Sequence, residues 1–497
     1  MHALDTLREP DAIATALAVA GVLLAAAVLL GRLSWRIGLP FVLVFLLVGM
    51  IAGDATPSVL HFDDPVTAFR VGTLALVLIL FDAGLQTPWS SARKVLAPSA
   101  LLASVGVFFT ALITALGCRL LGMSWATAAL VGAVTSSTDA AAVFAVLRGS
   151  GLRLRQRLAA TLEFEAGLND PVAVILTLAV TAAIASPATS SVPHVLGETF
   201  LQLAVGMAVG VGAGLLGRLG LERVHLTTGG LYPVLTTALA ATTYGVATLT
   251  HGSGFLAVYV AALILGRGNL RYRSGLVRVH EGLAWLSQVV MFLLLGLMVR
   301  PASLLPTAPI ALGVVGVLAL VARPVVVAAC LLPFRYSARE IAYVSWIGLR
   351  GAVPIVLAIF PVMAGLEVGS YVFHVVFFVV LANALVPGAT VRWVTRLLGM
   401  QSTHPPPPLA ALEITSTGRL DGDILVFRID PAAAVCDATL ADIPMPLGSS
   451  VMIVMRGPEL VVARGGTTLE PGDHVYVFAK HEDKPLVMLL FGDPIAE

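Results

Sequence analysis

Residues Glu163 to Asp170 read EFEAGLND, which places three carboxylates and one amide inside a long apolar run. The run extends over residues 158–185, and a helix needs only about 20 apolar residues to cross a bilayer. Ionisable groups at mid-membrane are energetically costly, and they typically mark ion or proton pathways. The stretch therefore predicts a membrane-spanning helix that carries an ion or proton site.

The composition also indicates a membrane protein. Of the 497 residues, 58% are hydrophobic and 12% are charged, and the mean hydropathy is +0.94. Soluble domains carry about 25% charged residues. A net charge of +1 gives no indication of a nucleic-acid partner. The leader before Ile13 is acidic, whereas a signal peptide begins with basic residues, so we expect the first apolar run to be retained as a span.

Thirteen apolar runs predict thirteen membrane spans, two of them short. They are 13–31, 39–53, 70–87, 97–121, 124–147, 158–185, 197–218, 230–250, 254–266, 283–299, 307–333, 340–364 and 370–394. Basic residues concentrate in alternate loops, and cytoplasmic loops carry the excess of Arg and Lys. The basic side holds Arg32, Arg36, Arg93, Lys94, Arg148, Arg153, Arg155, Arg157, Arg218, Arg223, Arg267, Arg271, Arg273, Arg278, Arg335, Arg339, Arg392 and Arg396, and the other side holds Arg8, Arg70, Arg119 and Arg300. We therefore expect the N-terminus outside and the C-terminus in the cytoplasm.

Two pairs of spans resemble each other. FVLVFLLVGMIAG from Phe41 is similar to FLAVYVAALILG from Phe255, with a second aromatic four residues later and a closing glycine. LILFDAGL from Leu78 is similar to VMFLLLGL from Val290. Seven spans separate each pair, so the copies run in opposite directions. Inverted repeats with short or interrupted helices are typical of secondary transporters.

The character of the chain changes after Met400. The stretch THPPPP begins a proline-rich linker, which we place at 401–418 between a transmembrane domain at 1–400 and a small domain at 419–497. Four short runs with strand character follow, DILVFRI, VMIVMR, ELVVAR and HVYVFAK. We expect a small cytoplasmic α+β domain.

Asp170 is the strongest candidate for the ion site. It lies well inside its span, and Pro171 directly after it interrupts the helical hydrogen bonds and frees a carbonyl. A buried carboxylate is stabilised either by a proton or by a bound cation, so the two compete for it. One titrating acid with the uncharged Asn169 beside it predicts electroneutral exchange of one proton for one monovalent cation. The alternative is that Asp170 only tethers another helix.

Other charged residues have structural interpretations. Glu163 shares a helical face with Asp170 and Glu165 does not, but Gly167 and Pro171 make ideal geometry doubtful, so spacing does not choose between the two glutamates. For Glu163 we favour pairing with an arginine. We expect Arg323 to neutralise a carboxylate.

Two spans contain predicted breaks. TSSTDAA at Thr135 interrupts the fifth span, and GLRGAVP at Gly348 interrupts the twelfth, seven spans later. Two broken helices that cross would bring opposed dipoles together at mid-membrane. Asp139 and Arg350 could neutralise the helix ends there, a structural role that we favour over direct chemistry.

Seven stretches in order resemble the monovalent cation:proton antiporter-1 family over about residues 10–400. They are LILFDAGL, SSTDAAAV, FEAGLNDPV, GSGFLAVYVAALILG, QVVMFLLLGL, ARPVVV and WIGLRGAV. The region from about Asp421, above all LEPGDHVYVFA, resembles the C-terminal regulatory module of potassium-transport proteins, of the RCK_C or TrkA-C type.

The resemblance implies a thirteen-helix homodimer with a mobile core domain and elevator-like alternating access. It implies that an alkali cation or a proton binds at Asp170, Glu165 and Thr138, and that Asn169 holds the core together. It also implies that Arg323 lies near Glu165 or Asn169, and that Arg350 pairs with Asp82 on the third span.

The chain departs from the family at two positions, Ala166, where relatives often have Ser, and Asp82, where many have Glu. Loss of the Ser hydroxyl, together with the regulatory tail, favours potassium over sodium.

The sequence therefore predicts a potassium/proton antiporter of the bacterial inner membrane, with a sodium/proton antiporter as the alternative. A tail-gated cation channel is a further alternative, but no filter-like repeat such as TVGYG is present. A non-transporting sensor has little use for a titrating acid at a helix break.

No nucleophile–base set or metal-ligand cluster indicates an enzyme, and no cofactor is expected. The expected partners are membrane lipid, a second copy of the chain and a small-molecule or nucleotide effector at the tail. Residues 421–480 contain no Gly-rich phosphate loop, so ATP or NAD binding of those kinds is not supported.

Overall fold

The structure is a computed structural model, and it describes residues 9–37, 40–55, 62, 64–87, 89–186, 192–224, 226, 228–267, 272–402, 422–431, 433–457, 459–492 and 494. The chain divides into two compact units. One comprises residues 1–270 and 276–403, and the other comprises 404–497 with 271–275. Of the predicted linker, only Gln401 and Ser402 lie within the described residues.

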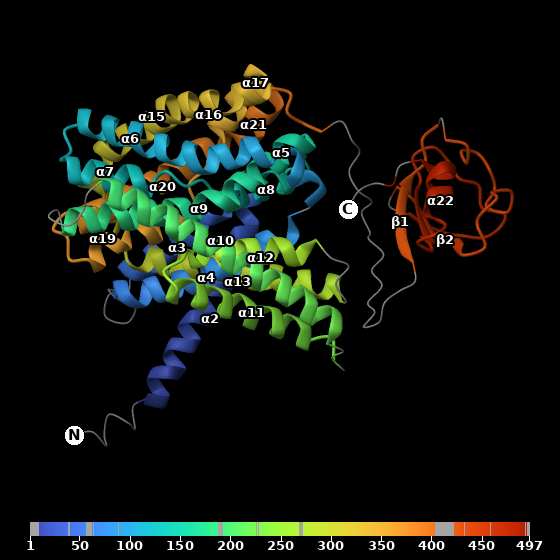
Figure 1. The fold of residues 1–497 in the computed structure, drawn as a ribbon, viewed down its shortest axis with the longest axis horizontal. Helices are drawn as coiled ribbons and strands as arrows, with labels where there is room; N and C mark the ends of the chain where they lie inside the picture. The colour runs from blue at the N-terminus through green and yellow to red at the C-terminus, as the bar shows by residue number, and fades with distance from the viewer. Residues whose placement is uncertain are drawn as a thin grey trace. The chain divides into compact units, whose positions relative to one another are not determined.

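The first unit is helical (Figure 1). Its elements are α2 Glu9–Ile37, α3 Phe41–Ala55, α4 Pro65–Gln86, α5 Trp89–Leu101, η1 Leu102–Gly106, α6 Val107–Leu120, α7 Trp125–Val134, α8 Ala140–Gly149, α9 Gln156–Ala185, α10 Val192–Arg223, α11 Leu231–Leu249, α12 Gly254–Gly266, α13 Arg273–Leu297, α14 Pro301–Leu304, η2 Leu305–Thr307, α15 Ala308–Val317, η3 Leu318–Ala322, α16 Arg323–Leu331, η4 Leu332–Phe334, α17 Ala338–Trp346, α18 Ala352–Leu357, α19 Ile359–Met363, α20 Gly369–Asn383, η5 Ala384–Gly388 and α21 Ala389–Leu397. Each of the thirteen predicted spans falls on one of these helices or on a run of them.

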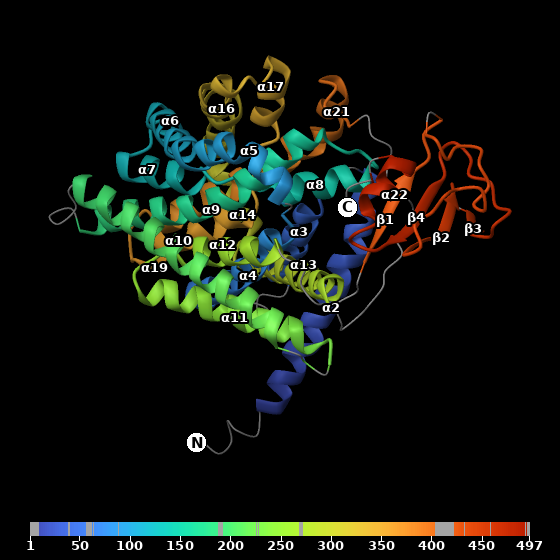
Figure 2. The same ribbon diagram turned by 45° about the vertical axis from the view of Figure 1, so that its right-hand side comes forward.

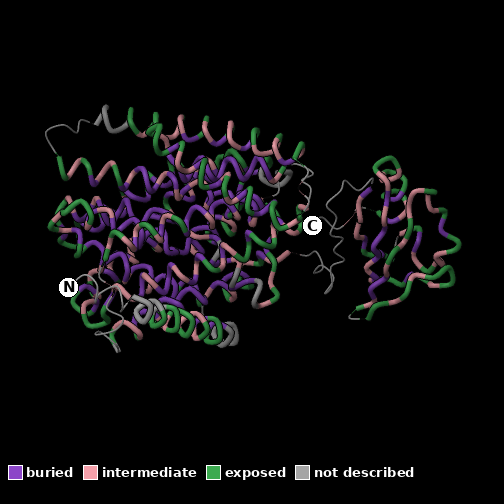
Figure 3. The backbone as a smooth tube through the Cα atoms, turned by 90° about the horizontal axis from the view of Figure 1, so that it is seen from below, coloured by how far each residue is buried: buried purple, intermediate pink, exposed green. Residues whose placement is uncertain are grey.

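Within the described residues, seven helices are long and apolar enough to cross a membrane by length and composition, and five more apolar helices are shorter. Many large apolar side chains on the outer helices are exposed, including Leu29 at 71%, Phe200 at 74% and Leu216 at 70%. Figure 3 shows buried residues gathered in the interior of this unit and exposed residues along its outer helices. Apolar surface of this extent suits contact with lipid chains, which fits a multi-pass membrane protein.

Both predicted breaks are present. The fifth span divides into α7 and α8, which are separated by residues 135–139, and the twelfth divides at residues 347–351 between α17 and α18. The short α12 is buried along nearly its whole length, so its unbroken apolar sequence reflects packing on all sides.

Equivalent contacts in the two halves support the internal repeat. Gly84 on α4 and Gly296 on α13 each lie against the backbone of a short helix, where a Cβ atom would not fit. The facing residues are Tyr259, Ala262 and Leu263 for Gly84, and Leu46, Gly49 and Met50 for Gly296. Each residue of the first set lies 213 positions after its counterpart, the same offset as between Gly53 and Gly266. We expected from the sequence that Phe45 corresponds to Tyr259. The offset of 213 instead pairs Tyr259 with Leu46, so that expectation was out of register by one residue.

Three π-helical turns, η1, η3 and η5, were not expected from the sequence. The first two fall in the fourth and eleventh spans, which are seven spans apart, and they read LASVG and LALVA. π-Helical turns interrupt the regular rotation of side chains around a helix and are frequent at functional sites. Arg323 is the first residue after η3.

Most of these helices form two groups, which occupy different sides of the unit in both Figure 1 and Figure 2. The scaffold bundle, α4, α10, α11 and α12, packs mainly within itself. The core bundle comprises α5, α6, α7, α9, α15, α16, α17 and α20, which are likewise linked mainly to one another. Contacts between the bundles are sparse, and they include α9 against α12 and α10.

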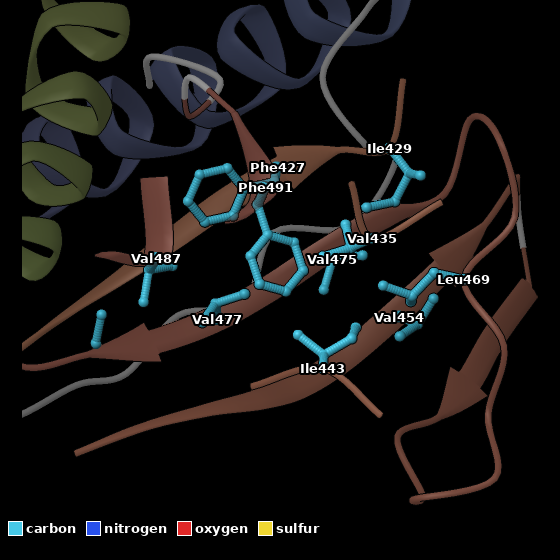
Figure 4. Close-up of a cluster of buried hydrophobic side chains, with 11 residues drawn as sticks. Phe427, Ile429, Val435, Ile443, Val454, Leu469, Val475, Val477, Val487 and Phe491 are labelled. Carbon is cyan, nitrogen blue, oxygen red and sulfur yellow. The ribbon is translucent and has the colours of Figure 1, made fainter. Parts of the chain in front are cut away.

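The second unit contains a four-stranded antiparallel sheet of order β1-β4-β2-β3 and one helix (Figure 2). Its elements are β1 Asp423–Arg428, β2 Ser449–Arg456, β3 Glu459–Val462, β4 His474–Ala479 and α22 Lys484–Phe491. All four strands fall on the predicted runs. Its apolar core includes Phe427, Val454, Val475, Val477 and Phe491 (Figure 4).

We predict that Gly84→Ala lowers stability by about 1–3 kcal/mol, because the added methyl group would lie 2.7 Å from the Tyr259 carbonyl oxygen and force α4 and α12 apart. Gly245→Ala on α11 is the matched control, because a Cβ there meets nothing within 4 Å. Thermal unfolding of detergent-solubilised protein, followed by size-exclusion chromatography, measures both. Equal unfolding temperatures for the two variants would contradict the tight contact.

Candidate functional site

The candidate site lies where the two helix breaks meet. The backbone N–H of Asp139 donates to the Leu349 carbonyl at 2.7 Å, which joins the break after α7 to the break before α18. Gly351 packs directly against the Asp139 carboxylate, where any Cβ would overlap it. Gly351 is therefore needed for the close approach of the two breaks.

The charged residues of the breaks lie at the helix ends, as expected. Asp139 Oδ1 accepts from the Ala142 N–H at 3.4 Å, in the first turn of α8. Arg350 Nε donates to the Thr135 carbonyl at 3.1 Å, at the end of α7. A carboxylate at a helix N-terminus and a guanidinium at a helix C-terminus both oppose the local dipole. The Arg350 guanidinium also donates to the Gly348 carbonyl, and its backbone N–H donates to Asn383 Oδ1 at 3.0 Å.

Asp170 approaches the first break from α9. Ser137 Oγ donates to Asp170 Oδ1 at 2.5 Å. Because Pro171 has no N–H, the Gly167 carbonyl one turn earlier loses its usual helical partner. The site therefore combines a carboxylate, a hydroxyl and a backbone carbonyl within one turn of α9 and the facing break.

Asn169 lies next to Asp170 and is 1% exposed. Its Nδ2 donates to Thr138 Oγ1 at 2.6 Å and lies 3.4 Å from the Thr138 carbonyl. Asn169 therefore connects α9 to the fifth-span break. Among the described residues, Asn169 Oδ1 and Glu165 Oε2 are buried acceptors without a hydrogen-bond partner.

Glu165 and Arg323 form a buried ion pair. Arg323 Nη1 donates to Glu165 Oε1 at 2.7 Å, and the two side chains are 4% and 2% exposed. This is one of the two placements that we expected for Arg323. The pair neutralises a charge that would otherwise be very unfavourable in the interior.

The expected pair between Arg350 and Asp82 is not formed, and this prediction was wrong. The Arg350 guanidinium is directed to the carbonyls of the two breaks. Asp82 is half-buried on α4 and accepts from Gln86 Nε2 at 2.7 Å. Carbonyl oxygens at a helix end can accept hydrogen bonds from a guanidinium. Charge matching alone therefore could not identify the partner of Arg350. Glu163 is exposed on α9.

A second contact of α9 faces the scaffold bundle. A Cβ on Gly167 would overlap the ring of Tyr259 on α12, including its hydroxyl. Phe164 lies on the same side, with its ring centroid 6.3 Å from that of Tyr259. Leu168 packs against Leu263 nearby. This apolar seam adjoins the turn of α9 that carries Asp170.

Sequence reasoning did not single out three residues of this region. Ser137 belongs to the predicted hydroxyl-rich break, but spacing does not tell which hydroxyl faces Asp170. Asn383 is a polar residue inside an apolar span, 2% exposed, and the rule that buried polar groups are functional or structural would have identified it. Tyr259 is marked only by its fit to a glycine on another helix.

Comparisons with known proteins agree with this geometry. The family profile described as "Sodium/hydrogen exchanger, transmembrane" matches residues 22–397, and the profile described as "TrkA-C domain" matches residues 424–492. The chain belongs to the sodium/hydrogen exchanger family. It is a membrane antiporter of this family, not an enzyme, and it carries a C-terminal TrkA-C domain.

Two relatives match nearly the whole of this exchanger. The K(+)/H(+) antiporter NhaP of Alkalimonas amylolytica is 38% identical over 96% of this chain and 83% of its own length. The K(+)/H(+) antiporter NhaP2 of Shewanella baltica is 37% identical over 95% of this chain and 82% of its own length. The solved structure of the sodium proton antiporter MjNhaP1 from Methanocaldococcus jannaschii has a TM-score of 0.65 and 22% identity, and the match covers 78% of this chain and all of that one. This likeness shows the fold of the exchanger's helical unit.

We predict that Arg323→Met in the exchanger costs about 3–5 kcal/mol of stability, because it leaves the Glu165 carboxylate buried without its cation. The double variant Glu165→Gln with Arg323→Met should recover most of that loss, because neither charge remains. Arg218→Met, which breaks a partly exposed pair with Glu222, is the control and should change stability little. Unfolding temperatures in detergent measure all three. A double variant as unstable as Arg323→Met would contradict the pairing.

Proposed function

We propose that the chain exchanges potassium for protons across the bacterial inner membrane, with Asp170 holding the two ions in turn. The observation that carries the proposal is the charge pattern of the site. Glu165 has Arg323, and Asp139 and Arg350 lie at helix ends. Within the described residues, the Asp170 carboxylate accepts from the Ser137 hydroxyl and forms no ion pair with a basic side chain. A carboxylate in that position is stabilised only by a proton or by a bound cation.

The neighbouring oxygens suit an alkali cation. Besides Asp170, the candidate ligands are the Ser137 hydroxyl, the Gly167 carbonyl and the unpartnered acceptors of Asn169 and Glu165. Hard cations prefer such carboxylate, carbonyl and hydroxyl oxygens. Thr138, which we also expected as a ligand, already accepts from Asn169 and keeps a second lone pair and its carbonyl for an ion.

Potassium is the proposed cation because the two relatives that match nearly the whole of this chain are named K(+)/H(+) antiporters. Ala166 next to Glu165 also offers no hydroxyl for a smaller ion. A single titrating carboxylate gives an electroneutral exchange of one cation for one proton. We further propose that the N-terminus lies outside and the C-terminus in the cytoplasm, that the chain works as a homodimer, and that the TrkA-C domain binds a small-molecule effector.

Alternating access is proposed as an elevator-like movement of the core bundle, which carries Asp170, past the scaffold bundle. The sparse contacts between the bundles support such a movement. The seam between Gly167 and Tyr259 is where the bundles meet next to the ion site. The Tyr259 ring packs against Gly167, which has no side chain. At this contact α9 can therefore move along α12 without a steric clash.

We predict that Asp170→Asn abolishes cation-dependent dissipation of a pH gradient in proteoliposomes at every pH, because the amide neither releases a proton nor neutralises a cation. Wild type should respond to potassium and show no dependence on membrane potential. Glu222→Gln, at a partly exposed position on α10, is the control and should behave as wild type. Activity with sodium but not with potassium would favour the sodium alternative, and exchange retained by Asp170→Asn would refute the proposed carrier. Uncoupled current through Asp170→Asn would instead support a channel.

The seam gives a second prediction. Gly167→Ala should slow exchange by about tenfold or more, since a methyl group against the ring costs about 1–3 kcal/mol in one or more states of the cycle. Tyr259→Ala in the same chain should restore much of the rate, because it removes the ring that the methyl group meets. Gly212→Ala on α10, where a Cβ meets nothing within 4 Å, is the control. Failure of the double variant to recover, with Tyr259→Ala alone active, would contradict the sliding contact.

A further inference from the structure

A short piece of β structure joins the end of the membrane unit to the start of the ion-site helix. Leu154 and Gln401 form an antiparallel β-bridge. On either side of it, the Ser402 N–H donates to the Arg153 carbonyl at 2.8 Å and the Arg155 N–H donates to the Met400 carbonyl at 3.1 Å. We call this pairing of 153–155 with 400–402 the terminal bridge. Its apolar side chains are buried, Leu154 at 7% and Met400 at 2% exposure.

The terminal bridge lies at two junctions of the chain. Arg155 is the N-cap residue of α9, the helix that carries Glu165, Asn169 and Asp170. Residues 400–402 follow the end of α21 after two intervening residues, and the chain continues from Ser402 toward the TrkA-C domain at 424–492. Asp170 lies 15 residues after Arg155 in one continuous helix, which spans about 22 Å.

Further contacts fasten the same end of α9 to the core bundle. Arg157 Nη2 donates to the Phe334 carbonyl at 2.8 Å, and its guanidinium lies 3.8 Å from the centroid of the Tyr336 ring. The Tyr336 hydroxyl lies 2.7 Å from Thr161 Oγ1, one turn further along α9. On α21, Thr390 Oγ1 accepts from Trp346 Nε1 of α17 at 2.9 Å. The chain thus leaves the membrane unit from the core bundle and not from the scaffold bundle.

We propose that the terminal bridge is the mechanical connection through which the tail controls exchange. A force or restraint on the chain at Ser402 passes through backbone hydrogen bonds to the N-cap of α9, and so to the helix that carries Asp170. This inference rests on the proposed function, because it concerns regulation of that same ion site. A connection to the moving bundle lets the tail change the free energy of the core bundle in one access state relative to the other.

The backbone of Arg155 allows a selective test. Its φ is −55°, which proline adopts without strain, and the residue before it is in extended pairing, as a residue before proline prefers. Arg155→Pro therefore removes the N–H that binds Met400 and leaves the helix start intact. Arg155→Ala is the matched control, since it removes the same exposed side chain and keeps the N–H.

The experiment compares full-length protein with and without its tail attached. A protease recognition sequence is placed after Ser402 within the predicted linker, and the protein is cleaved before reconstitution. Potassium/proton exchange of cleaved and uncleaved protein is then measured in proteoliposomes. Cleavage should change the rate of wild type and of Arg155→Ala by about fivefold or more, which is the usual lower range of coupling between sites. Cleavage of Arg155→Pro should leave its rate unchanged.

Two results would overturn the inference while exchange itself persists. One is no effect of cleavage on wild type, and the other is an equal effect on Arg155→Pro and Arg155→Ala. Loss of all exchange by uncleaved wild type would instead refute the proposed function. If Arg155→Pro does not fold, Ser402→Pro against Ser402→Ala makes the same comparison on the hydrogen bond to Arg153.

Discussion

The constraint on which this structure depends is that an ionised group inside a membrane must be neutralised. The chain satisfies it in a different way at each position. Glu165 and Arg323 neutralise each other, and Asp139 lies at the start of α8. The Arg350 guanidinium binds the Thr135 carbonyl where α7 ends and the Gly348 carbonyl in the second break. The Asp170 carboxylate accepts from the Ser137 hydroxyl, and within the part of the chain that the structure describes it forms no ion pair with a basic side chain. In the proposed function, this is the carboxylate whose counter-charge is exchanged.

The backbone geometry that makes this place depends on glycine and proline. Gly351 lets the two breaks approach, Pro171 frees a carbonyl beside the acid, and Gly84 and Gly296 bring the short helices against their neighbours. The contacts of Gly84 and Gly296 lie at equivalent positions of the two halves. An internal repeat therefore supplies two broken helices whose ends meet, which a single copy could not provide. Different side chains in the two breaks, Asp139 in one and Arg350 in the other, then give the crossing its opposite charges.

Much of the fold follows from the sequence because membrane spans, breaks and strands depend on local composition. The thirteen runs, the interruptions at 135–139 and 347–351 and the four strands of the tail all fall on elements of the structure. Contacts between distant segments were predicted less well. Arg323 was expected near Glu165 or Asn169, and it pairs with Glu165. Arg350 binds carbonyls and not Asp82, because backbone acceptors leave no signature in the sequence. The role of Ser137, the π-helical turns and the fit of Tyr259 to Gly167 likewise depend on how helices rotate against one another. The repeat was found from the sequence, but only the packed glycines fixed its register.

The central claim is that a proton and a potassium ion exclude each other from one carboxylate. The most direct measurement is the number of protons released when potassium binds to the purified protein in weakly buffered detergent solution, with potassium binding followed by calorimetry in parallel. The account predicts one proton released for each potassium ion bound, with the apparent potassium affinity falling as the pH is lowered. Potassium binding without proton release, and with an affinity independent of pH, would contradict it.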